Sequence, residues 1–169
     1  MSGVTDLNDL MKGMSPELEN CEYVFLTLQQ LSSYTKEEKN YIMHLAIDEA
    51  VATFREEEGL TVVLSAAFAK KNVFGDNGET PARIRKEWIE ILGSLDTLST
   101  MKRITMKIHS SLTAVGFTAA FSKVLTEANI SCNVFAGYYH DHIFVPTKDA
   151  ERAMQVLTDV IKSAKENSH

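Results

Sequence analysis

The sequence predicts an α+β protein of the ferredoxin-like kind, in which two helices pack on one face of an antiparallel sheet. Three observations support this class. Residues 103–169 alternate between strand and helix patterns in the order βαββα, and residues 50–64 have the pattern of a β-hairpin. The composition, with 44% hydrophobic and 24% charged residues, eight Gly and only three Pro, is that of an ordinary globular protein.

The N-terminal region begins with a short amphipathic helix and a strand. Apolar residues between Val4 and Met14 recur at helical spacing, and Pro16 marks where this helix has already ended. Residues 22–28, EYVFLTL, are rich in β-branched and aromatic side chains and have apolar groups on both faces. This pattern is typical of a buried strand.

A second helix and a hairpin follow. TKEE at residues 35–38 is a capping-box pattern and predicts a helix over about 36–48. Two β-like runs in residues 50–64 join at EEEG, where Gly59 can adopt the positive φ of a tight turn. The acidic run REEE (55–58) is expected at the solvated tip of this hairpin, because adjacent strand residues point to opposite faces and cannot converge on a substrate.

The middle of the chain predicts a loop and then a helix. Residues 70–82 combine Gly, Asn, Asp and Pro with few apolar residues, as exposed loops do. Pro81 and Gly93 stand at positions typical of a helix start and of the residue just past a helix end. The helix between them carries an apolar stripe of Ile84, Trp88, Ile91 and Leu92. Trp88 is therefore expected in the core rather than in a ligand site.

The C-terminal region has the clearest pattern. Residues 103–110 alternate between apolar and polar side chains, as a strand does. Residues 112–130 have one apolar helical face, and the apolar residues from Ala150 to Ala164 form one face of a last helix. SCNVFAGYY (131–139) and HIFVP (142–146) resemble paired strands, with a turn at His140 and Asp141 between them.

Charge and hydropathy exclude several classes of protein. A formal net charge of -6 argues against a protein that mainly binds nucleic acid. No secretion-signal pattern and no long apolar run is present, so the sequence predicts a cytoplasmic protein without a membrane segment. Motifs typical of nucleophilic catalysis, phosphate binding or zinc binding are also missing from the sequence.

Several long segments resemble a known family. They are SGVTDLNDLMKGMSPEL followed by EYVFLTL, then ATFREEEGLTVVL, then ITMKIHSSLTAVGFTAAFSKVLTEANISCNVFAGYYHDHIFVP. They closely resemble small, mostly bacterial proteins built from two ACT-type domains. The C-terminal half is also similar to the ACT modules of aspartate kinases and of the cytosolic arginine sensor in animal growth signalling. The stretches SSYTKEEKNYIMHLA and KKNVFGDNGETPARIRKEWIEILGSLDTLST are longer than the connections that the family pattern has there.

The resemblance implies a fold and a domain organisation. It implies tandem ferredoxin-like ACT domains, each of the βαββαβ type. On this sequence they would comprise an N-terminal ACT-like domain at 1–70, a linker with an inserted helix at 71–102, and a C-terminal ACT domain at 103–169.

The resemblance also implies a function. It implies a non-catalytic regulatory or sensor protein, without a cofactor, that binds a small molecule, most often an amino acid, at an interface between ACT domains. A homodimer is expected, since an open sheet edge needs pairing or cover. The ligand-binding loop of the family carries over onto Ser110, Ser111, Leu112, Thr113, Ala114, Val115 and Gly116.

The residues of this loop support two interpretations. A helix that begins here offers unpaired N–H groups and a positive dipole end to an anion, and the hydroxyls of Ser110, Ser111 and Thr113 can add hydrogen bonds. The alternative is that Ser111 or Thr113 caps the helix and that Gly116 relieves crowding against the sheet.

The segment GYYHDHIFVP raises a further question. His140 and His142 are two residues apart, so on one strand they would share a face, with His109 from a neighbouring strand as a third metal ligand. A metal-dependent enzyme that uses these histidines is one alternative function, and a purely structural interaction domain is another. Because the histidines match no metal-binding spacing, a turn between strands is favoured. In that turn Asp141 can also hold the cationic group of a ligand bound near Ser110.

Overall fold

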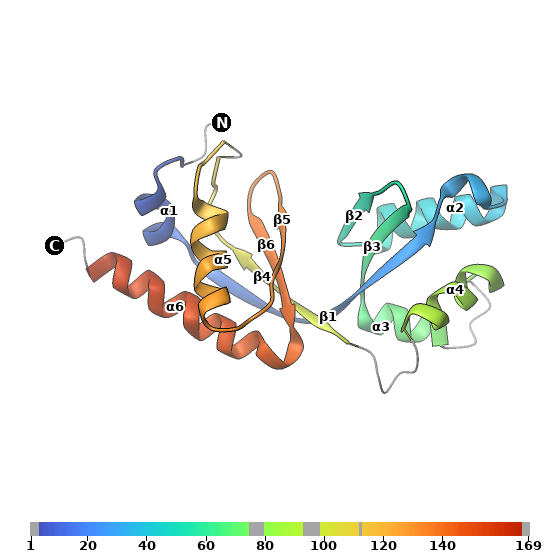
Figure 1. Ribbon diagram of the computed structural model, residues 1–169. Helices are drawn as coiled ribbons and strands as arrows, with labels where there is room; N and C mark the ends of the chain where they lie inside the picture. The colour runs from blue at the N-terminus through green and yellow to red at the C-terminus, as the bar shows by residue number, and fades with distance from the viewer. Residues whose placement is uncertain (1–3, 75–79, 93–98, 112, 167–169) are drawn as a thin grey trace. The chain divides into compact units, whose positions relative to one another are not determined.

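The structure is a computed structural model that describes residues 4–74, 80–92, 99–111 and 113–166 (Figure 1). It divides into two compact units. Unit 1 comprises residues 1–20 and 101–169, and unit 2 comprises residues 21–100. This division differs from the expected domains at 1–70 and 103–169, because the first twenty residues pack with the C-terminal region. The expected linker, 71–102, instead contributes a helix to the core of unit 2.

Unit 1 contains the predicted βαββα series and completes it with a strand from the N-terminal region. In this unit the strand order is β1-β4-β6-β5, and both β4 and β5 pair antiparallel with β6. Only the first part of strand β1 belongs to this unit. The elements are α1 (Leu7–Gly13), β1 (Pro16–Gln29), β4 (Met101–Met106), α5 (Phe117–Glu127), β5 (Asn133–Ala136), β6 (Asp141–Pro146), the 3-10 helix η5 (Thr147–Asp149) and α6 (Ala150–Glu166).

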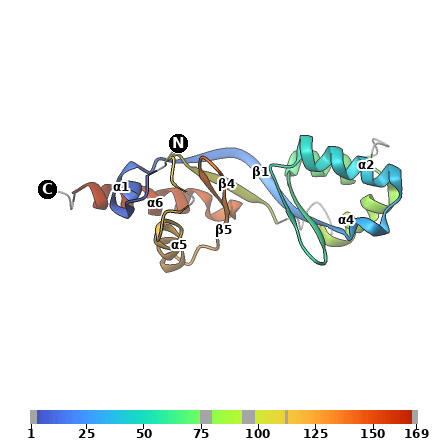
Figure 2. The ribbon, with the colours of Figure 1, turned by 90° about the horizontal axis from the view of Figure 1, so that it is seen from above.

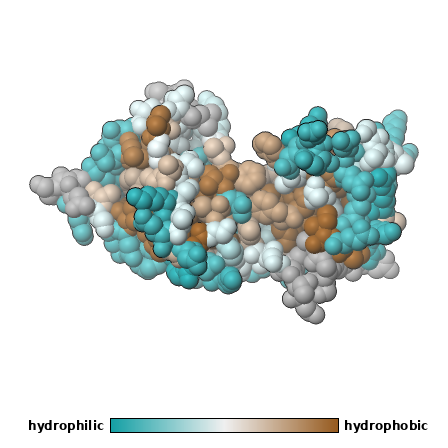
Figure 3. All heavy atoms as spheres, in the orientation of Figure 1, coloured by the Kyte–Doolittle hydropathy of each residue, from teal (hydrophilic) through white to brown (hydrophobic). Residues whose placement is uncertain are grey.

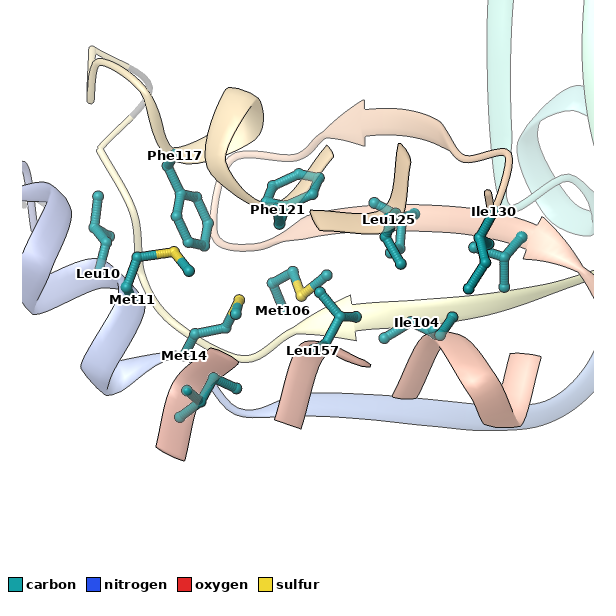
Figure 4. Packing of buried hydrophobic residues seen from close by; sticks show 14 of the residues in the cluster. Leu10, Met11, Met14, Ile104, Met106, Phe117, Phe121, Leu125, Ile130 and Leu157 are labelled. Atoms are coloured by element: carbon teal, nitrogen blue, oxygen red, sulfur yellow. The ribbon is translucent and has the colours of Figure 1, made fainter. Parts of the chain in front are cut away.

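The core of unit 1 lies between one face of this sheet and the three helices. Ile104 of β4 pairs with Ile143 of β6, so both side chains lie on the same face. Phe117, Phe121 and Leu125 of α5 point toward β4 in Figure 4, and Figure 2 shows α5 to one side of β1 and β4. Helix α1 and its C-cap residue add three buried side chains, namely Leu10, Met11 and Met14. Each fully buried side chain of this size contributes about 1.5–3 kcal/mol.

Two ion pairs join the first residues of β1 to β4 and to the residue that follows it. Glu19 accepts two hydrogen bonds from the Arg103 guanidinium, at 2.8 and 3.0 Å, and Glu17 lies 3.3 Å from the ammonium of Lys107. Bidentate pairing of this kind fixes the position of one strand against the other. Strand β1 begins at Pro16, whereas the apolar pattern predicted a strand that begins at residue 22, because the first residues of β1 are mostly polar and so do not continue that pattern.

Unit 2 contains the predicted helix and hairpin, with the strand order β2-β3-β1. The capping box is confirmed, because Thr35 Oγ1 accepts from the Glu38 amide at 3.2 Å and Glu38 accepts from the Thr35 amide at 2.8 Å. The acidic hairpin tip is exposed and hydrophilic, as predicted (Figure 3). The remaining elements are the 3-10 helix η1 (Leu31–Ser33), α2 (Lys36–His44), the π-helix η2 (Leu45–Glu49), β2 (Ala52–Arg55), β3 (Gly59–Ser65), α3 (Ala66–Ala69), the π-helix η3 (Lys70–Phe74) and α4 (Ala82–Leu92).

The region around α4 was predicted in part. Ile84 and Trp88 are fully buried in the core of unit 2, as the apolar stripe predicted, whereas Ile91 is 49% exposed. The expected exposed loop at 70–82 is wrong for its first residues, because Lys70–Phe74 form a π-helix in which Asn72 is buried. The rest of this expected loop lies partly outside the described residues, as do Gly93 and the Leu92 side chain.

None of the helices in the described ranges is long and apolar enough to cross a bilayer.

Candidate functional site

In unit 1 the loop after β4 contacts the turn between β5 and β6. The Ser110 side chain interacts with the Asp141 carboxyl group, and both residues are more than nine-tenths buried. His140 Nδ1 lies 3.2 Å from the carbonyl oxygen of Ile108. The ring of His109 packs against Tyr139 with centroids 5.6 Å apart. The structure therefore brings together the loop and the turn that the sequence predicted to form one site.

Asp141 begins strand β6 instead of lying within the turn. The turn is formed by residues 137–140, closed by a 3.0 Å hydrogen bond from the Gly137 amide to the His140 carbonyl. Burial raises the pKa of Asp141 above its ordinary value of 3.8, and the hydrogen bond from Ser110 and the charge of His140 oppose the rise. The carboxylate is thus a buried group that holds the loop through Ser110.

Helix α5 begins later than predicted and has no side-chain cap. Its N-cap is Gly116, whose φ of 92° is left-handed, so the helix cannot extend back to residue 112. The alternative interpretation, in which Ser111 or Thr113 caps the helix, is wrong. Ser111 Oγ instead accepts from the Thr113 amide at 3.3 Å and lies 2.9 Å from Thr113 Oγ1. Leu112, the third predicted loop residue, lies outside the described residues.

The start of α5 is suited to an anion. No side chain among the described residues caps its first-turn amides, and these carry the positive end of the helix dipole. Thr113 is exposed, and Val115 is 84% exposed beside it. A carboxylate at this position would accept backbone hydrogen bonds that the free helix leaves to solvent.

Sequence reasoning missed one contributor to this site. Val4 forms a parallel bridge with Ser110, in which the Val4 amide donates to His109 at 3.0 Å and the Ser111 amide donates to Val4 at 3.0 Å. Leu7 of α1 lies close to Gly116, where an added Cβ would be 3.4 Å from a Leu7 methyl. A single bridge has no periodicity, so the pattern of residues 2–14 predicted a helix and gave no sign of this contact.

The three histidines do not come together. His142 Nδ1 lies 3.0 Å from the Thr105 hydroxyl on β4, while His140 and His109 contact Ile108 and Tyr139. Burial lowers the pKa of His142, and the charge of Arg103 lowers it further. Within the residues that the structure describes, no group of three side chains is arranged to bind a metal ion. The geometry therefore contradicts the proposed metal ligand set.

Comparison with known proteins identifies the fold. Models of the ACT domain match residues 2–79 and 100–159. Among solved structures, the chain is similar to a Vibrio cholerae protein of unknown function, described as a possible transport protein. The two chains are 38% identical, the alignment covers 95% of this chain and 99% of the other, and the TM-score is 0.63. No curated protein matches the chain.

More distant structures share the fold. The aspartokinase alpha and beta subunits are 11% identical over 88% of this chain and 97% of theirs, with a TM-score of 0.58. The regulatory subunit of aspartate kinase from Thermus thermophilus is 8% identical over 86% of this chain and 95% of its own, with a TM-score of 0.55. The predicted ferredoxin-like α+β class is confirmed, and this chain belongs to the ACT-domain family as a small protein with two ACT domains in tandem.

Proposed function

We propose that the protein is a non-catalytic regulator that binds an amino acid at the loop between β4 and α5. Its two ACT domains, together with neighbours that are regulatory subunits, support a regulatory and ligand-binding role. The observation that carries the choice of site is the uncapped start of α5 next to the buried Ser110–Asp141 pair. That arrangement offers a preformed position for a ligand carboxylate, beside a loop that the buried Ser110–Asp141 pair holds in place.

Each part of the loop has a role in this proposal. The ligand carboxylate would accept hydrogen bonds from the first amides of α5, and the hydroxyls of Ser111 and Thr113 would add polar contacts. Gly116 lets the ligand approach the backbone, and Asp141 keeps Ser110 in position. The proposed ligand-binding residues are Ser110, Ser111, Leu112, Thr113, Val115, Gly116 and Asp141.

A homodimer is part of the same proposal. Val115, Tyr138 and Tyr139 are 84%, 63% and 56% exposed on the loop and turn of the site, and large exposed apolar side chains favour burial against another molecule. A second copy of the chain that covers this end of unit 1 would enclose the ligand. A cytoplasmic location, where free amino acids are available, agrees with this role.

Isothermal titration of the purified protein against the proteinogenic amino acids tests the proposal. One amino acid should bind with a dissociation constant below about 1 mM, and Thr113→Val should weaken its binding about tenfold through the lost hydroxyl. Thr126→Val, at the other end of α5, is the matched control and should bind like the wild type. Absence of heat with every amino acid at about 10 mM would overturn the proposal, and a protein that dimerises without binding would be an interaction domain.

A further inference from the structure

We propose a second small-molecule site, in unit 2, that takes an α-amino acid with a large apolar side chain. It is a cavity of about 570 Å³ between α2 with its π-helix η2 and α3 with its π-helix η3. Small-molecule sites usually measure about 300–1,000 Å³. The cavity is lined by Tyr41, His44, Glu49, Phe68, Lys71 and Asn72.

Both walls of this cavity contain a π-helical turn. The Ala50 amide donates to the carbonyl of Leu45 at 2.9 Å, which is the i to i+5 bond that defines such a turn. A π-turn adds one residue to a helical turn. The side chains after this turn therefore point in a different direction around the helix axis from the one they would have in a regular α-helix. Glu49 belongs to η2, while Lys71 and Asn72 belong to η3. Two helices with the same rare irregularity therefore supply the charged side chains of one cavity.

The charges of the cavity complement a zwitterion. Glu49 is an anion and Lys71 a cation, both exposed to solvent, and among the described residues neither has an ion-pair partner. They would pair with the ammonium and the carboxylate of an amino acid. Asn72 provides a fixed polar wall, since it is 3% exposed and its Nδ2 donates to the Phe68 carbonyl at 2.9 Å.

The apolar part of the ligand would meet two aromatic rings. Tyr41 and Phe68 line the cavity and pack against the hydrophobic core of unit 2. The Tyr41 hydroxyl lies 2.9 Å from Thr80 Oγ1, and this contact holds the ring in place. Aromatic rings prefer an aromatic or aliphatic partner, so an amino acid such as L-phenylalanine matches both these rings and the charges of Glu49 and Lys71.

Trp88, the only tryptophan of the chain, reports on this site. It is fully buried in the core cluster against which Tyr41 and Phe68 pack. Titration of the whole protein with L-phenylalanine should change Trp88 fluorescence saturably, and phenethylamine and 3-phenylpropionate, which lack the carboxylate and the ammonium, should bind at least about tenfold more weakly. Glu49→Gln and Lys71→Gln should each weaken L-phenylalanine binding by about tenfold.

Matched controls test whether the charges of the cavity itself are responsible. Lys70→Gln and Glu57→Gln remove charges that do not line the cavity and should leave L-phenylalanine binding unchanged. Isothermal titration supplies the stoichiometry. The inference is overturned if L-phenylalanine at about 10 mM produces neither a saturable fluorescence change nor heat. It is also overturned if phenethylamine and 3-phenylpropionate both bind as tightly as L-phenylalanine, or if Lys71→Gln binds L-phenylalanine like the wild type. The Lys71→Gln result does not depend on whether the loop of unit 1 binds an amino acid, because Lys71 lies in unit 2.

Discussion

The pairing of strand β3 with strand β1 depends on a single glycine for a steric reason. A Cβ at Gly59 would lie 1.9 Å from the backbone carbonyl oxygen of Leu28, so the two strands would have to separate. Gly59→Ala should lower the free energy of unfolding by about 1–3 kcal/mol, as measured by urea unfolding followed through Trp88 fluorescence. Gly13→Ala is the control, because there the added Cβ meets only the mobile end of the Ile108 side chain, at 2.9 Å. Equal losses for both variants would contradict this explanation.

The backbone conformation of Gly59 differs from the one that its sequence context suggested. Its position at EEEG suggested a positive φ, but among the described glycines only Gly116 has one. The close approach to Leu28 arises from strand pairing between residues far apart in the sequence, which a local turn pattern does not contain.

Asp141 should make the stability of unit 1 dependent on pH. Because burial raises the pKa of its carboxyl group above 3.8, the folded protein binds this proton more tightly than the unfolded chain does. The stabilisation from this group is complete below the unfolded pKa and is lost as pH rises through the folded pKa. In Asp141→Asn that loss is absent, so urea unfolding should show the variant gaining stability relative to the wild type between about pH 3 and pH 7. A difference that stays constant over this range would disprove the argument.

At the scale of elements, local sequence signals predicted the features that depend only on residues within one helix. The capping box at Thr35 and Glu38 and the apolar stripe of α6 depend on residues within a few positions of each other, and both are present. Apolar periodicity misplaced the start of α5, since Val115 continues the pattern although it is 84% exposed. The left-handed backbone at Gly116, rather than hydrophobicity, sets the first residue of that helix.

The sequence predicted which two segments lie together at the candidate site, but not the contacts between their residues. The strand order of a ferredoxin-like unit places the loop after β4 beside the β5–β6 turn, so the fold class alone implied that Ser110 and Asp141 lie near each other. The burial of this pair and the bridge from Val4 depend on contacts made only in the folded unit. Sequence patterns describe faces of single elements and cannot show which segment covers a loop.

At the scale of the whole molecule, the first ACT sequence contributes its N-terminal segment to the unit formed by the second. The first ACT match begins at residue 2, yet residues 1–20 pack in unit 1 with the second ACT sequence. Unit 2 is thus inserted between two parts of unit 1. The ferredoxin-like order of unit 1 is complete only with the first part of β1, which lies beside β4 at one end of the strand order of this unit.

This contribution of residues 1–20 predicts that residues 101–169 do not fold alone. Without residues 1–20 they lose the β1 strand and the side chains of Leu10, Met11 and Met14, and burial of these three contributes about 6 kcal/mol, comparable to the whole stability of a small domain. Circular dichroism of the 101–169 fragment should show no cooperative thermal transition, and addition of a peptide of residues 1–20 should restore one. A peptide with Leu10→Asp and Met14→Asp is the control and should have no effect, because a charge at either position cannot enter the core. If the fragment melts cooperatively by itself, unit 1 does not need the N-terminal segment, and its core is complete within the second ACT sequence.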